Sequence, residues 1–234
     1  MREKLMDITH DEEAIFLSRE NRFLGRVKLK STGEIHDVHV RDPGRLEEIL
    51  YQGNEVLIRK ADNPNRKTGY DLIAGKVKDN WILVNSGFHR QITEIILEDE
   101  MLSPFCKIDS YTAEQQLGKS RIDFLLEKHG EKIWLEVKGC TLAIDGTALF
   151  PDAPTTRGKR HIEELISAEE NGDRAALIFL IFRPDAECFR PYEKRDPDFS
   201  RTFWKAVEEG VDVYAVQLEY ENGALYYKGQ IPVK

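Results

Sequence analysis

The sequence predicts a mixed α/β protein with two domains, a small β-barrel over residues 1–85 and a helix-flanked mixed sheet over residues 86–234. Three observations lead to this prediction. Short apolar stretches separated by turn residues fill the first part of the chain. Segments with helical periodicity alternate with strand-like segments in the second part. The run at 175–182 is apolar throughout, which is typical of a strand buried on both faces of such a sheet.

The composition is that of a globular protein. The 234 residues are 41% hydrophobic, which supplies a sizeable core. No apolar run is long enough to cross a bilayer and no signal region is present, so we expect a cytoplasmic protein without membrane contact. The three cysteines are widely spaced, which suggests neither a disulfide framework nor a thiolate zinc site.

In the barrel, strands are expected near 22–29, 35–40, 56–58, 71–74 and 81–84. The segment 42–50 is predicted to form a turn that leads into a short helix. Gly44 permits an unusual backbone angle, and amides at the start of that helix could bind an anion beside Arg45. The alternative is that Gly44 only makes the turn and that Arg45 is solvated.

A basic loop gives the barrel a candidate nucleic-acid surface. The formal net charge of −8 argues against such a partner, but a local basic strip is compatible with an acidic exterior. Basic side chains near an aromatic, here Tyr70, are typical of barrels that bind nucleic-acid strands. A charged loop without function is the alternative. The basic residues flank the turn at 63–65 and are Arg59, Lys60, Arg66 and Lys67.

The clearest local pattern is a hairpin over residues 120–139. Two apolar runs flank His129 and Gly130, which predicts antiparallel strands joined by a two-residue loop. That loop fixes the register, so Asp123 lies directly opposite Glu136. Because side chains alternate along a strand, Asp123, Glu136 and Lys138 share one face.

Facing carboxylates repel unless a cation or a shared proton lies between them. Mg²⁺ or Mn²⁺ suits such oxygen ligands, and Lys138 could orient water or neutralise a phosphate. Two alternatives remain open. In the first, the three residues are ordinary polar residues of a solvated sheet face, and Lys138 is only ion-paired to Glu136. In the second, the carboxylates belong to a glycosidase, although a lysine fits phosphate better than sugar.

Basic residues also begin the predicted helix that ends at Asn171 and Gly172. Arg157, Lys159 and Arg160 oppose the helix dipole there, and a bound phosphate would offset that cost. His161 alone is more often structural. Other helices are predicted at 89–101 and at 200–209, the latter capped by Ser200. Residues 141–156 are expected to be rich in loops.

Asp123 followed by Glu136-Val137-Lys138 resembles the PD-(D/E)XK nuclease motif, with Ile122 where proline often stands. The longer pattern Ser-Arg-Ile-Asp-Phe-Leu-Leu, Glu-Val-Lys and Phe-Pro-Asp-Ala-Pro-Thr-Thr-Arg-Gly is similar to the sugar fermentation stimulation protein A (SfsA) family. The resemblance implies an OB-fold-like barrel, a PD-(D/E)XK nuclease-like second domain and DNA binding with little sequence preference. It also implies that Glu114 is an acidic site residue.

Two functions follow. The first is a metal-dependent nuclease acting on DNA or RNA, with Asp123, Glu136 and Glu114 as metal ligands and Lys138 as a catalytic residue. The basic residues of the barrel loop and of the helix near 160 would bind the phosphate backbone. The alternative is a non-catalytic DNA-binding regulator linked to sugar metabolism. The chain departs from the family pattern at Phe182-Arg183, where relatives tend to have glutamine and arginine.

Overall fold

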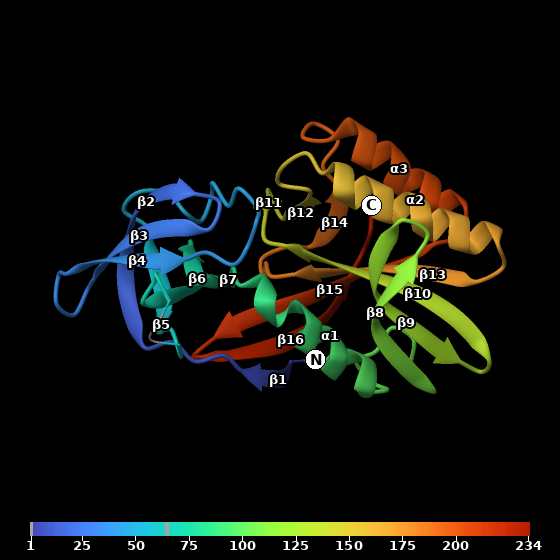
Figure 1. The fold of residues 1–234 in the computed structure, drawn as a ribbon, viewed down its shortest axis with the longest axis horizontal. Coiled ribbons are helices and arrows are strands. Elements are labelled where there is room, and N and C mark those ends of the chain that lie inside the picture. The colour runs from blue at the N-terminus through green and yellow to red at the C-terminus, as the bar shows by residue number, and fades with distance from the viewer. Residues whose placement is uncertain (1, 64–65) are drawn as a thin grey trace.

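The computed structural model describes residues 2–63 and 66–234. Residues 64 and 65, in the turn of the predicted basic loop, lie outside the described residues. The barrel and the second sheet lie side by side, and the helices gather on the second sheet (Figure 1). Among the described residues no helix is both long and apolar enough to cross a membrane.

Five strands with the spatial order β4-β3-β2-β5-β6 close into a barrel, because the two strands at the ends of this order pair with each other. β4 joins β6 through Val38 opposite Tyr70 and His39 opposite Asp71. Buried and exposed side chains alternate along β3, as expected for a strand with one face in the core. This confirms the predicted OB-type barrel. Its strands are β2 (Glu12–Asn21), β3 (Leu24–Leu29), β4 (Ile35–His39), β5 (Glu55–Lys60) and β6 (Tyr70–Val77).

The second sheet is mixed, and its order from one edge is β8-β9-β10-β13-β15. The three strands β10, β13 and β15 run parallel, which agrees with the predicted central position of the apolar run. On its other side, β15 pairs antiparallel with β16. β16 in turn pairs with β1, the first strand of the chain. The bounds are β1 (Glu3–Asp7), β7 (Asn80–Leu83), β8 (Ser110–Leu117), β9 (Ser120–Lys128), β10 (Glu131–Cys140), β13 (Arg174–Ile181), β15 (Asp212–Glu221) and β16 (Ala224–Ile231).

Helices cover both faces of this sheet. The apolar side of α1 packs with Phe124 and Leu126, whereas α2 and α3 lie beside each other over the opposite face, above Trp134 and Leu177 (Figure 1). Trp134 shares a sheet face with Glu136 and Lys138, and it is buried there beneath α2. The helical segments are η1 (Ser86–Phe88), α1 (His89–Glu98), α2 (Thr156–Glu170) and α3 (Pro197–Glu208).

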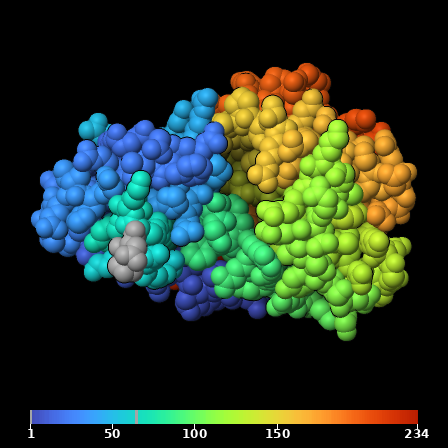
Figure 2. Space-filling model, viewed as in Figure 1, coloured from blue at the N-terminus to red at the C-terminus, as the bar shows by residue number. Residues whose placement is uncertain are grey.

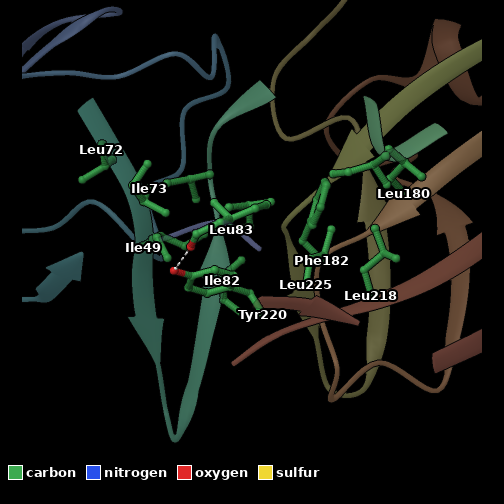
Figure 3. Packing of buried hydrophobic residues seen from close by; sticks show 14 of the residues in the cluster. Ile49, Leu72, Ile73, Ile82, Leu83, Leu180, Phe182, Leu218, Tyr220 and Leu225 are labelled. Atoms are coloured by element: carbon green, nitrogen blue, oxygen red, sulfur yellow. Dashed lines mark hydrogen bonds between the residues drawn. The ribbon is translucent and has the colours of Figure 1, made fainter. Parts of the chain in front are cut away.

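One hydrophobic cluster joins the barrel to the second sheet. Ile73 and Leu83 belong to the same buried cluster as Leu180 and Leu218 (Figure 3). β7 reaches across as well, because Trp81 pairs with Tyr220 of β15. The shared core holds the barrel against the side of the second sheet that β15 forms.

Two sequence predictions were wrong in detail. Residues 42–50 form turns rather than a short helix, and Leu46 has a left-handed φ of 53°. Ser200 does not cap the last helix, because Asp196 does so by accepting a hydrogen bond from the amide of Phe199. The segment 141–156 is rich in loops, as predicted, and it also includes two short strands, which form a small sheet with a strand 41 residues further on. These strands are β11 (Ala143–Ile144), β12 (Thr147–Phe150) and β14 (Cys188–Pro191).

Candidate functional site

The strands of the central hairpin part at the predicted acidic pair. His129 and Gly130 both have positive φ, as a two-residue hairpin turn requires. Pairing then follows the predicted register as far as Phe124 opposite Leu135. Beyond that point β10 remains paired with β13 and β9 with β8, so the sheet opens into a fork.

Asp123 lies where the fork begins. Its Oδ2 accepts a hydrogen bond of 2.8 Å from the amide of Val137, so the carboxylate takes the place of a backbone partner. Burial raises the pKa of Asp123 to about 6, and the nearby charge of Glu136 adds to that rise. Asp123 thus gains a proton more readily than an exposed aspartate.

A pocket of about 370 Å³ fills the space between the fork and the two helices α1 and α2. The three acidic residues and the lysine that the sequence predicted for the site all line this pocket. The helices add further side chains to its walls. The lining residues used below are Glu114, Asp123, Glu136, Lys138, Ser86, His89, Arg157 and His161.

Glu136 is the most deeply buried carboxylate of the pocket, with 2% of its side chain exposed. Its Oε1 accepts hydrogen bonds from Lys138 Nζ and from His161 Nδ1. Burial opposes ionisation, but the charge of Lys138 and the His161 bond outweigh it and hold the pKa of Glu136 below its usual value. Oε2 is buried and accepts no hydrogen bond from the described residues. The site therefore contains an ionised carboxylate with one oxygen unpartnered.

His161 is held by an ordered chain of side chains. Arg157 Nε lies 3.3 Å from His161 Nε2, and a guanidinium only donates, so Nε2 accepts. In a neutral ring the proton is then on Nδ1, where it is donated to Glu136 over 2.5 Å. The sequence interpretation of His161 as a structural residue missed this contact. The one available signal was its position one helical turn after Arg157.

His89 is a second ring that sequence reasoning missed. It stacks on Phe182 with ring centroids 5.3 Å apart and lies over Gly139 of β10. Burial lowers the pKa of His89 to about 4, and the charge of Lys138 lowers it further, so the ring is neutral near pH 7. Its place depends on the packing of α1, which no local sequence pattern specifies.

Glu114 lies at the rim of the pocket. It has a φ of 57° and interrupts the pairing of β8 with β9, because its neighbours Ala113 and Gln115 are paired and it is not. The side chain is about half exposed and forms a 3.6 Å ion pair with Arg121. Across residues 2–63 and 66–234 no group of three or more His, Cys, Asp or Glu is arranged to hold a metal ion.

The predicted phosphate-binding residues of α2 do not lie together in one place. Arg157 lines the pocket, whereas Lys159 pairs with Glu163 one turn along the helix at 3.7 Å. Arg160 Nε donates to Ser120 Oγ at 3.3 Å, which ties α2 to β9. Of the three, Arg157 is therefore the one that faces the carboxylates.

The predicted basic residues of the barrel are also dispersed. Arg66 forms two hydrogen bonds, of 2.9 and 2.8 Å, with the carboxylate of Asp71, and Lys67 lies beside it. Arg59 lies over the ring of Phe88, 5.6 Å from its centroid. Lys60 is exposed at the end of β5. These residues do not form one continuous cluster.

Arg45 is exposed and 3.5 Å from Glu47. The anion expected beside it is supplied by the protein itself, because Leu46 donates its amide to Oδ2 of Asp152 at 3.2 Å. Asp152 lies in the loop that precedes α2. This contact closes the barrel turn against the second domain.

A second hollow, of about 450 Å³, continues from the pocket toward the barrel. The two hollows share Ser86, His89, Val137, Lys138 and Arg157. The second one adds Arg22 and Asp42 from the barrel. Figure 2 shows the surface hollowed between the blue barrel and the gold segment of α2, with olive atoms at the bottom. The pocket is thus one end of a cleft between the two domains.

Together, the fold and the pocket define a class of two-domain proteins in which an OB-type barrel adjoins a mixed sheet with an acidic, lysine-containing pocket. Two family models match the chain, the SfsA N-terminal OB domain over residues 17–84 and the sugar fermentation stimulation protein RE domain over residues 87–224. The chain belongs to the sugar fermentation stimulation protein (SfsA) family.

Relatives match over almost the whole chain. The sugar fermentation stimulation protein homolog of Methanococcoides burtonii is 50% identical, covering 98% of this chain and 94% of its own. The homolog of Methanothermobacter thermautotrophicus is 44% identical, and the match covers 91% of this chain and 88% of that protein. A solved structure, described as Pyrococcus furiosus SfsA in complex with Ca²⁺, is similar with a TM-score of 0.89, 32% identity and 99% coverage of both chains.

Proposed function

We propose that the protein binds DNA or RNA with little sequence preference and cleaves its phosphodiester backbone with Mg²⁺ or Mn²⁺ at the pocket. The observation that supports this best is Oε2 of Glu136, which is buried, belongs to an ionised carboxylate and accepts no hydrogen bond from the described residues. Such an oxygen is costly to bury unless a cation or another donor meets it. Asp123 supplies a second oxygen donor beside it.

The donor set fits a hard divalent cation. Mg²⁺ and Ca²⁺ both take carboxylate oxygens, and Mg²⁺ usually keeps several waters and completes its shell with substrate phosphate. Two carboxylates in a pocket with polar walls match that preference. The Ca²⁺ complex described for the Pyrococcus furiosus relative supports a cation of this type in the family. Glu114, at the rim, would act through water or after leaving Arg121.

Each residue of the pocket would have a separate role in cleavage. Asp123 and Glu136 would hold the metal ion, which when bound supplies a Lewis acid for the scissile phosphate. Lys138, held against Glu136, would orient the attacking water and offset negative charge that develops on the phosphate oxygens. Arg157, on the wall formed by α2, would hold a neighbouring phosphate. His161 fixes the orientation of Glu136.

A cleavage assay tests the proposal. Wild type, Asp123→Ala and Lys138→Ala are incubated with single-stranded and duplex DNA and with RNA, in Mn²⁺, in Mg²⁺ and in a chelator. Cleavage that requires the metal and is lost in both variants supports the enzyme. Lys132→Ala is a matched control, because Lys132 is on the same strand as Lys138 but is exposed near the hairpin end and does not line the pocket. Cleavage that persists in Asp123→Ala contradicts the proposed site.

One observation favours a second candidate, a DNA-binding regulator that cleaves nothing. The part of the chain that the structure describes holds no group of three metal-ligating side chains, and Lys138 is paired with Glu136. A regulator linked to sugar metabolism would bind DNA in every metal condition and cleave it in none. Gel-shift binding measured beside the cleavage assay separates the two candidates.

A further inference from the structure

A hollow of about 530 Å³ lies on the barrel, outside the pocket described above. Its main apolar feature is Phe23, at the turn between β2 and β3, whose side chain is 49% exposed. The ring of Phe23 is stacked against that of His39, with centroids 6.4 Å apart and planes inclined by 29°. His39 Nδ1 is also 3.1 Å from the carbonyl oxygen of Phe23. The two rings form an ordered aromatic surface that is open to solvent.

Positively charged side chains line the same hollow as these rings. Arg41 and Arg66 line the hollow and share a single buried carboxylate, that of Asp71, at 3.5 and 2.8 Å. Asp62 also attracts the charge of Arg66, so these two arginines face two carboxylates. Lys67 lies on the same rim and adds a positive charge beyond them.

The acidic residue of the hollow does not cancel this surplus. Asp37 lies on the rim but is 3.5 Å from Arg26, outside the hollow. An aromatic surface beside surplus positive charge matches a ligand that has both flat rings and anionic groups.

The hollow leads toward the pocket. Arg22, next to Phe23 in the chain, lines the cleft between the domains. Arg41 lines the hollow, and its carbonyl oxygen accepts a 2.7 Å hydrogen bond from Ser86 Oγ, a residue of both the pocket and the cleft. An extended chain that leaves the hollow past Arg41 therefore meets Ser86 and then Lys138.

We infer that Phe23 and His39 form a stacking subsite for an unpaired base of single-stranded nucleic acid, whose backbone passes Arg41 toward the pocket. This rests on the proposed function and narrows its substrate to a strand with an unpaired segment. A base in the interior of a duplex is covered on both faces by its neighbours, so it has no free face to stack on Phe23. Stacking of one base on an aromatic side chain changes affinity by roughly 5- to 100-fold.

Binding measured in a chelator tests the subsite without cleavage. The probes are fluorescent twelve-nucleotide oligo(dT) and oligo(U) and a covalently closed circular duplex DNA, which has no terminal base pair. Phe23→Ala is expected to weaken binding of the single strands by roughly 5- to 100-fold and to leave duplex binding unchanged. Phe23→Trp is expected to retain single-strand binding. Oligo(dT) and oligo(U) distinguish a DNA preference from tolerance of both sugars.

Ile35→Ala is the matched control, because Ile35 is a large apolar residue, 56% exposed, on the same barrel but outside the hollow. Equal affinity of wild type and Phe23→Ala for single strands overturns the subsite. Absence of single-strand binding by wild type, or equal losses for strand and duplex, overturns it as well. A photocrosslink from 5-iododeoxyuridine to the peptide that contains residue 23 would support it independently.

The two proposals fail separately. If wild type cleaves nothing but Phe23→Ala still weakens single-strand binding, the proposed cleavage is wrong and the subsite stands. If wild type cleaves with metal and Phe23→Ala binds and cleaves like wild type, the subsite is wrong and the cleavage proposal stands.

Discussion

Nδ1 of His161 lies 2.5 Å from Oε1 of Glu136, although the two residues are 25 positions apart in the chain. His161 comes from α2 and Glu136 from β10, so this contact links the helix layer to the fork in the sheet. The same imidazole accepts from Arg157. The orientation of the proposed metal ligand is thus determined by a helix that contributes no carboxylate to the pocket.

The first prediction concerns this contact. In His161→Asn the amide nitrogen lies near the position of Nδ1 and can still donate to Glu136, whereas in His161→Gln it lies near Nε2. We expect Asn to keep most of the Mn²⁺ affinity and Gln to lower it roughly 10- to 100-fold, as loss of a partner of a metal ligand does. Isothermal titration with Mn²⁺ gives the comparison. Equal losses in both variants, with unchanged melting temperatures, would show that Nδ1 does not position Glu136.

The second prediction concerns metal-linked stability. A ligand that binds only the native state at one hundred times its Kd adds about 2.7 kcal/mol to the free energy of unfolding. For a chain of this size we expect Mn²⁺ to raise the melting temperature by about 5 to 10 °C. Glu136→Gln should abolish this rise, because the unpartnered Oε2 is then no longer part of an anion.

Glu131→Gln is the control for this measurement, since Glu131 is on the same strand but exposed at the hairpin end. A Glu136→Gln variant that is stabilised by Mn²⁺ as much as wild type would place the ion elsewhere. Differential scanning calorimetry across a Mn²⁺ series distinguishes the two results.

The acidic site could be predicted from sequence because one short turn defines it. His129 and Gly130 permit a two-residue hairpin loop, and the register that follows brings Asp123 and Glu136 to adjoining strands. The hydrogen bonding around the two carboxylates could not be predicted from the turn alone. The pairing stops just before the two carboxylates, and Asp123 bonds to the amide of Val137 instead.

What sequence could not supply came from distant parts of the chain. Residues 42–50 have helical periodicity, but Asp152, more than a hundred positions away, accepts from Leu46 and stabilises a turn. The short strand β12 pairs with β14, which lies much later in the chain, and β1 pairs with β16 at the other end of the chain. Local propensity contains none of these partners, so tertiary contacts decide the outcome.

The third prediction is a pH dependence at the barrel turn. Burial raises the pKa of Asp42 to about 6, and the charge of Asp152 adds to the rise. Between pH 4 and 6 the native state therefore binds more protons than the unfolded state. The free energy of unfolding contributed by Asp42 is largest below pH 4 and is lost as pH rises through 6.

Asp42→Asn removes that titration and keeps an oxygen for the amide of Gly44. We expect the variant to be more stable than wild type by about 1 to 3 kcal/mol at pH 7.5 and equal to it at pH 3.5. Urea unfolding at both pH values measures the difference. Asp79→Asn, at an exposed turn, should show no such change. A constant difference at both pH values would mean that Asp42 ionises normally in the native state.

The fourth prediction tests how α1 is seated on β10. Gly139 has no side chain, and a Cβ atom added there would lie 2.3 Å from Cε1 and 2.7 Å from Nε2 of His89. Gly139→Ala must therefore push the His89 ring or the start of α1 away. Overpacking of this kind costs about 1 to 3 kcal/mol, which urea unfolding detects.

His89→Ala removes the ring that the added methyl group would meet, so the double variant separates this cause from others. If the clash is with the ring, Gly139→Ala should cost much less in the His89→Ala background, with a coupling energy of about 1 kcal/mol or more. Additive costs would indicate that the new methyl group meets the backbone of α1 or β10 instead. His89→Phe, which keeps a ring of similar width, should restore the full cost of Gly139→Ala, because the clash depends on the volume of the ring and not on its nitrogens.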